Sequence, residues 1–163
     1  MKFWDSSALV PLLVEEETTA ALRDLYLGEQ GAIAWWGAPV ECASAVARVE
    51  REGRLSPEEA TEALGRLDAL ASHWNRIEPV DAVLETARRL LRVHPIRAAD
   101  SLQLAAAYLA SEGRPSTLEI VCLDERLATA AQREGFPVRD RSRLESPKDA
   151  GEAPAPEAPA PDD

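Results

Sequence analysis

Four acidic residues have the type and position to bind a divalent cation. Asp5, Glu41, Asp100 and Asp124 each lie at or near a predicted helix start, and no zinc-type His or Cys spacing accompanies them. Ligands that offer only oxygen favour Mg²⁺ or Mn²⁺ over zinc. One or two such ions, placed together, activate water and stabilise the oxyanions of phosphoryl displacement. The residue types therefore indicate metal-assisted chemistry on a phosphate ester.

Taken singly, three of these acids have a simpler interpretation. Asp5 and Asp124 each follow an apolar stretch and are suited to capping a helix N-terminus. Glu41 comes two residues after Pro39, where it interacts favourably with the helix dipole. Asp100 is different, because it lies in an alanine- and leucine-rich segment where burying a carboxylate without a partner is costly.

The elements that must position these acids alternate between strand and helix patterns. The sequence predicts strands at 2–4, 31–36, 76–80, 118–123 and 136–139. It predicts helices at 6–14, 17–30, 39–51, 57–74, 81–93, 97–111 and 124–134. The strand at 118–123 is the clearest. Pro11 limits or kinks the first helix, Ser56 and Glu59 suit a capping box, and Asp81 suits a helix cap. Strands separated by helices predict an α/β fold, with a parallel sheet and helices on both faces.

This topology brings the four acids together. Loops that follow parallel strands gather along one edge of the sheet, where ligands bind. Asp5, Glu41 and Asp124 all follow strands, and Asp100 at a helix start can join them. Carboxylates so close together raise one another's pKa values, and a divalent cation would relieve that conflict.

Composition predicts one globular domain, residues 1–145, followed by an acidic, Pro- and Ala-rich disordered tail, residues 146–163. The formal charge is −11, of which the tail contributes −4, so the body carries −7. An acidic body binds nucleic acid poorly, unless bound cations or local arginines supply positive potential.

The two cysteines, Cys42 and Cys122, lie in apolar stretches and are interpreted as buried, reduced thiols of a cytoplasmic protein. The first residues do not form a signal peptide, and no apolar run approaches the roughly 20 residues of a membrane span.

Four stretches resemble the PIN-domain ribonucleases, and within them the VapC-type toxins of prokaryotic toxin–antitoxin pairs. They are FWDSSAL from Phe3, VECASA from Val40, HPIRAADSLQLA from His94 and VCLDERLA from Val121. The third is the most specific, and the order and spacing of all four carry the resemblance, which covers roughly residues 1–140.

The resemblance implies a PIN-like three-layer α/β/α fold with a short-stranded parallel sheet. It implies that Asp5, Glu41, Asp100 and Asp124 bind Mg²⁺ or Mn²⁺ and catalyse RNA cleavage. Ser7 matches a small hydroxyl position near the metal and is predicted to contact the substrate. Cys122 stands where the family often has Thr or Ser, which removes a hydroxyl contact there. The family also implies a homodimer and an inhibitory antitoxin partner.

Other residues have more than one interpretation. Arg97 lies three residues before Asp100, so it could bind a phosphate of the substrate or pair with that acid, and the pair is favoured. Trp35 and Trp36 are interpreted as packing residues in the core or a dimer interface rather than base-stacking ones. The two histidines, His73 and His94, are interpreted as surface or helix-end residues. Four arginines are interpreted as solvated helix faces, with guidance of RNA as the alternative: Arg88, Arg89, Arg92 and Arg126.

Three alternative functions are compatible with parts of the pattern. A non-catalytic PIN-like binding module would not need all four acids. A free-standing RNA-processing or DNA nuclease would share the metal chemistry. A phosphatase of the haloacid-dehalogenase type would have a second aspartate two residues after the first, where this chain has Ser7.

Overall fold

The computed structural model describes residues 1–29 and 31–144, and within them five strands form one sheet. The strands are β1 (Lys2–Trp4), β2 (Ala32–Trp35), β3 (Asn75–Ile77), β4 (Ile120–Val121) and β5 (Val138–Arg139). Their order is β3-β2-β1-β4-β5, and every pairing is parallel. The predicted parallel α/β sheet is confirmed, with β1 at its centre.

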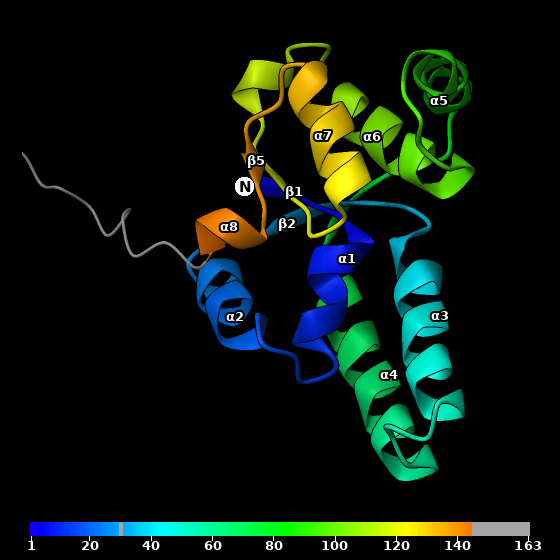
Figure 1. Cartoon of the computed structure of the whole chain (residues 1–163), viewed down its shortest axis with the longest axis vertical. Coiled ribbons are helices and arrows are strands. Elements are labelled where there is room, and N and C mark those ends of the chain that lie inside the picture. The colour runs from blue at the N-terminus through cyan, green and yellow to red at the C-terminus, as the bar shows by residue number, and fades with distance from the viewer. Residues whose placement is uncertain (30, 145–163) are drawn as a thin grey trace, which may run out of the picture.

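Helices cover both faces of this sheet (Figure 1). One layer contains α5 (Asp81–Val93), α6 (Ala98–Ala110) and α7 (Glu125–Arg133). The other contains α1 (Ser6–Leu9), α2 (Thr19–Leu27), α3 (Ala38–Arg51) and α4 (Pro57–Ala71). Short elements complete the chain: the 3₁₀ turns η1 (Val10–Leu12) and η2 (Pro115–Thr117), and α8 (Arg141–Leu144). The three-layer α/β/α arrangement is therefore confirmed.

Alternation along β1 divides the core between the two layers. Successive strand side chains point to opposite faces. Phe3 packs with the apolar side chains of α5, α6 and α7, whereas Trp4 packs with those of α1 to α4. Both side chains are fully buried. The central strand is therefore anchored on both faces, which fixes the position of the residue that follows it, Asp5.

The segment predicted as the clearest strand, 118–123, is shorter in the structure. Only Ile120 and Val121 belong to β4. Leu118 ends the turn η2, and the N–H of Leu123 donates to the hydroxyl of Ser7 rather than to a neighbouring strand. The third predicted strand, 76–80, is likewise reduced to Asn75–Ile77.

Helix ends follow the predicted signals only in part. Ser56 and Glu59 form the predicted capping box of α4. The helix predicted at 6–14 is shorter, because α1 ends at Leu9 and the chain passes into η1, which contains Pro11. Asp81 was predicted as a cap but is the first residue of α5, and Val80 precedes it without a side-chain cap. The helix predicted to reach Trp74 ends at Ala71, because Trp74 is buried just before β3.

The predicted tail, residues 146–163, and the domain boundary at 145 lie outside the described residues. Among the described helices, none is both long and apolar enough to cross a bilayer.

Two glycines offer a matched test of this backbone. Gly65 lies inside α4 with open space around it, so Gly65→Ala should stabilise the protein by about 0.5–1 kcal/mol through the unfolded chain. Gly135 ends α7 at a φ of +94°, so Gly135→Ala should destabilise it by roughly 1–2 kcal/mol. Urea unfolding measures both. Equal effects of the two substitutions would contradict the assigned conformation of Gly135.

Candidate functional site

Asp5 is held at the end of β1 by the residues that follow it. Its Oδ2 accepts the backbone N–H of Ser7 at 2.9 Å and a short bond from the Ser7 hydroxyl, so the predicted helix cap exists. The residue is only 4% exposed. A capping role and a metal-binding role are compatible, since the cap bonds fix the carboxylate in place.

The charge of Asp5 is disfavoured in this position. The pKa of Asp5 is raised from 3.8 to about 6, chiefly by burial and also by the nearby charge of Glu41, while the bonds from Ser7 act in the opposite direction. Two carboxylates from β1 and α3 therefore approach each other closely enough to repel. This is the electrostatic conflict that the sequence topology predicts.

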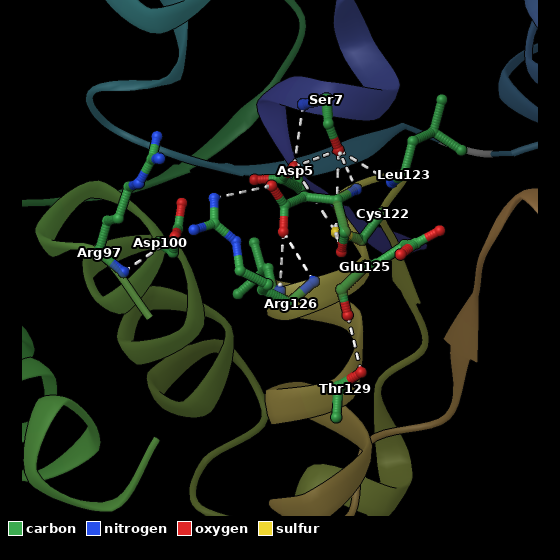
Figure 2. A network of polar contacts seen from close by, with 11 residues as sticks. Asp5, Ser7, Arg97, Asp100, Cys122, Leu123, Glu125, Arg126 and Thr129 are labelled. Carbon is green, nitrogen blue, oxygen red and sulfur yellow. Dashed lines mark hydrogen bonds and ion pairs between the residues drawn. The ribbon is translucent and has the colours of Figure 1, made fainter. Parts of the chain in front are cut away.

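Ser7 connects two of the predicted acids. Its hydroxyl donates to Asp5 and accepts the backbone N–H groups of Leu123 at 2.8 Å and Asp124 at 3.2 Å (Figure 2). One donor and two acceptor positions exhaust the capacity of a hydroxyl. The bonds therefore give Ser7 a positioning role between the ends of β1 and β4. Contact with substrate, which was its predicted role, would require one of these bonds to break.

Asp124 lies at the start of α7 and is partly exposed. Its Oδ1 accepts the backbone N–H groups of Arg126 at 2.9 Å and Leu127 at 3.0 Å, as predicted for a cap. Its Oδ2 lies 3.8 Å from the guanidinium of Arg126. One carboxylate oxygen is thus fixed by the helix, and the other faces a cation of the chain itself.

Glu41 is held by two residues that sequence reasoning missed. Its Oε2 accepts bonds from the hydroxyl of Ser6 and from Nε2 of Gln103 at 2.9 Å. Gln103 also donates to Ser6 at 2.6 Å and is 1% exposed. A buried amide three residues after Asp100, in an otherwise apolar helix, is the signal that could have identified it.

Asp100 lies in the first turn of α6, where its Oδ2 accepts the backbone N–H of Arg97 at 3.0 Å. Among the described residues, no ion pair joins the Arg97 guanidinium to Asp100, so the favoured ion pair is wrong. The contact runs from the backbone instead (Figure 2). A role for Arg97 in binding substrate stays a prediction.

The structure brings the acids together unequally. Asp5 is linked to Asp124 through Ser7 and to Glu41 through charge, while the contact given for Asp100 is local to α6. Among the described residues, no three Asp, Glu, His or Cys side chains are grouped closely enough to form a ready metal site. In donor type, oxygen alone, and in the buried charge of Asp5, the residues nevertheless fit a hard divalent cation.

Cys122 fills the space beside these acids. Its Sγ lies 3.7 Å from Oδ2 of Asp5 and 3.8 Å from Oγ of Ser7. Burial raises the pKa of the Cys122 thiol, and the charge of Asp5 adds to the shift. Burial likewise raises the pKa of Cys42 to about 12. Both cysteines are buried, as predicted, and both stay protonated at neutral pH.

The other singled-out residues occupy varied surroundings. His94 is buried, so the predicted surface position is wrong. It directly follows α5, as the predicted helix-end position requires, and its Nε2 lies 2.7 Å from Oε1 of Glu134. Trp35 is buried in the core, whereas Trp36 is 48% exposed. Arg89 pairs with Glu134 instead of being freely solvated.

Comparison with known proteins yields similarity in structure alone. No protein-family model matches the sequence, and no curated protein matches it. A solved toxin–antitoxin complex from Klebsiella pneumoniae matches with a TM-score of 0.56 and 15% identity, over 78% of this chain and 91% of that chain.

Two further solved structures match slightly better. FitAB bound to an IR36 DNA fragment gives a TM-score of 0.59 and 19% identity, over 86% of this chain and 94% of that chain. FitAcB from Neisseria gonorrhoeae gives a TM-score of 0.58 and 20% identity, over 85% of this chain and 96% of that chain. Identities this low establish the fold alone. The chain has a PIN-like α/β fold, as its motifs predict.

The buried charge of Asp5 makes a testable contribution to stability. An acid whose folded pKa is raised gains stability as the pH falls through that value, because the folded state then binds a proton more tightly than the unfolded chain. Asp5→Asn keeps an acceptor oxygen for Ser7 and removes the charge. The variant should therefore be more stable than the parent above pH 6, by roughly 3 kcal/mol for a shift from 3.8 to about 6.

This advantage should shrink towards zero below about pH 4, where Asp5 is protonated in both states of the parent. Urea unfolding of the two proteins between pH 4 and pH 7.5 measures the difference. Asp68→Asn, at an exposed position of α4, controls for the loss of one charge. A difference between Asp5→Asn and the parent that does not vary with pH would rule out the assigned burial of charge.

Proposed function

We propose that this chain is a metal-dependent endoribonuclease and the toxin of a type II toxin–antitoxin pair. The observation that carries the proposal is the tie between Asp5 and Asp124 through Ser7, with Glu41 beside them. It brings carboxylates from separate elements to the carboxyl edge of a parallel sheet, where such folds bind ligands.

The proposed cofactor is Mg²⁺ or Mn²⁺, held by Asp5, Glu41, Asp124 and Asp100. Oxygen donors suit these ions, and a cation would offset the cost of the buried Asp5 charge. When bound, such an ion polarises a phosphate oxygen and makes water more acidic.

The residues of the chain orient this chemistry. Ser7 fixes Asp5 and the start of α7 relative to each other, while Ser6 and Gln103 fix one oxygen of Glu41. Because each acid is fixed through one oxygen, a cation can approach without loss of the bonds that position the side chain. None of the four acids is singled out as the general base.

The presence of all four acids favours a nuclease over a non-catalytic binding module. The fold likeness to chains of toxin–antitoxin complexes favours a toxin over a free-standing processing nuclease. We accordingly propose an antitoxin partner, and RNA rather than DNA as the substrate. Two buried protonated thiols suit a reducing cytoplasm, which is the proposed location.

A homodimer is the proposed assembly. Large apolar side chains are exposed on α5 and beside it, namely Val80, Leu84, Leu91 and Val93. Trp36 is also exposed, and its backbone N–H donates to the carbonyl of Ile77, four residues before α5 begins. Exposed apolar groups gathered on one element are typical of protein interfaces.

Cleavage is the direct test of the proposed activity. Purified protein should cut a mixed pool of structured RNAs with Mg²⁺ or Mn²⁺ and not with EDTA. Asp100→Asn should lower the rate by about 100-fold, because a proposed carboxylate ligand of the catalytic ion is lost. Asp68→Asn, outside the site, should cut like the parent. Cutting by Asp100→Asn at the parental rate in Mg²⁺ would remove Asp100 from the site.

Thermal unfolding with added Mn²⁺ separates an inactive site from a missing RNA target. A bound ion stabilises the folded chain according to its concentration and affinity. Mn²⁺ should raise the Tm of the parent and raise that of Asp5→Asn less. If neither cutting nor a Tm shift is seen, the metal-dependent nuclease proposal fails.

The dimer has a separate test with a matched control. Leu84→Glu combined with Leu91→Glu places two charges on the proposed interface and should convert the dimer to a monomer in light scattering after gel filtration. Leu27→Glu changes a leucine that is 74% exposed on α2 and should leave the dimer intact. A parent protein that is monomeric at tens of micromolar would contradict the proposed assembly.

A further inference from the structure

A cleft of about 250 Å³ opens on α7 beside the candidate site. His94 and Pro95 form one wall, and Arg126, Thr129 and Arg133 form the other. Figure 2 shows Arg126 near the start of α7 and Thr129 further along that helix, away from Asp5. The cleft lies close to one of the four acids, because the guanidinium of Arg126, which lines it, lies 3.8 Å from Oδ2 of Asp124.

The charge of this cleft differs from that of a second cleft, which is lined by Ser7 and Glu41. The lining of the cleft on α7 holds two guanidinium groups and one carboxylate, Glu125. The second cleft, about 350 Å³, holds the carboxylates of Glu16 and Glu41 against the single guanidinium of Arg48. In a chain of net charge −11, a cleft beside Asp124 whose lining holds two arginines and one acid is a local exception. Phosphates are drawn to such a place.

Helix geometry sets the spacing of the two guanidinium groups. Arg126 and Arg133 are seven residues apart on α7, so their side chains lie on one face about 10 Å apart along the axis. That separation is too great for both to grip one phosphate, and it suits two phosphates of one strand. Among the described residues, no ion pair holds Arg133, and Arg126 has only the distant contact with Asp124.

We propose that this cleft binds the sugar–phosphate backbone of an RNA strand beside the bond that is cut, with one phosphate on Arg126 and another on Arg133. The position relative to the cut rests on the proposed nuclease function, whereas the binding of the backbone does not. Guanidinium groups bind phosphates through a planar fork of donors. Arg126 lies between the acids and the cleft, so it can contact the phosphate nearest to the site.

Substitution of Glu125 should change RNA binding in the opposite direction from substitution of the arginines. Glu125 lines this cleft as well as the larger cleft beside Cys122, and its negative charge opposes a phosphate bound near Arg126. Removal of this charge should strengthen binding, while removal of either arginine should weaken it. A set of substitutions with opposite expected signs distinguishes a defined backbone site from a general effect of net charge.

The experiment measures binding of a labelled single-stranded RNA of mixed sequence, about 12 nucleotides long, in EDTA at several salt concentrations. No metal-dependent step takes part, so the result is independent of cutting. Arg126→Gln and Arg133→Gln should each weaken binding roughly tenfold, since each loses a hydrogen bond to a charged group. Each should also lower the slope of log K against log salt by about 0.7. Glu125→Gln should bind more tightly.

Arg51→Gln is the matched control, because it removes the same charge at the exposed last residue of α3. It should keep the salt slope of the parent. Equal losses for Arg51→Gln and Arg133→Gln, or no RNA binding by the parent, would overturn the inference. So would an RNA affinity unchanged in both cleft variants together with weaker binding of an acidic peptide, since the cleft would then serve a protein partner.

Cleavage assays separate this inference from the proposed function. If RNA binding depends on Arg126 and Arg133 but neither cutting nor a Tm shift with Mn²⁺ is seen, the cleft is a binding site and the nuclease proposal fails. If cutting occurs and Arg133→Gln raises KM without lowering kcat, both stand, because Arg133 then holds the strand away from the reacting atoms.

Discussion

The hydroxyl of Ser7 fills the gap between the ends of β1 and β4, where the two strands stop pairing. It donates a hydrogen bond to Asp5 and accepts hydrogen bonds from the backbone N–H groups of Leu123 and Asp124. Those groups would otherwise have to find another partner, and leaving a buried donor unpaired costs about 1–3 kcal/mol. A single small side chain thereby sets the distance between two acids that lie more than a hundred residues apart in sequence.

The parallel topology makes this arrangement both possible and costly. Every strand ends at the same edge, so loops with acidic residues meet there without any special connection. The same convergence places Asp5 beside Glu41 in a buried setting, where ionisation is disfavoured. The chain compensates with polar contacts to single oxygens, from Ser7 to Asp5 and from Ser6 and Gln103 to Glu41. Rigidity of the site thus comes from neutral donors and not from fixed ion pairs.

Local signals predicted the elements well and their side-chain partners poorly. Capping at Ser56 and Asp124 depends on residues a few positions away, so sequence suffices to predict it. The length of β4 depends on Ser7, which captures the N–H of Leu123 from across the fold, and sequence alone gives no sign of that. Gln103 supports Glu41 through a contact between residues 62 positions apart, which periodicity cannot reveal. The acids themselves could be chosen because each also follows a strand or begins a helix.

If the proposed function holds, an acidic protein acts on an acidic polymer, and the placement of its positive charge decides where that polymer binds. A broadly basic surface would hold RNA everywhere, whereas this chain keeps most arginines in ion pairs or spread over helix faces. The arginines of α7 are an exception, because one lies at the edge of the acids and the other two turns further along the same face. Since guanidinium stays charged at all working pH values, attraction at this cleft does not depend on the protonation of Asp5. Binding of the backbone and charge neutralisation at the acids can therefore be tuned by separate residues.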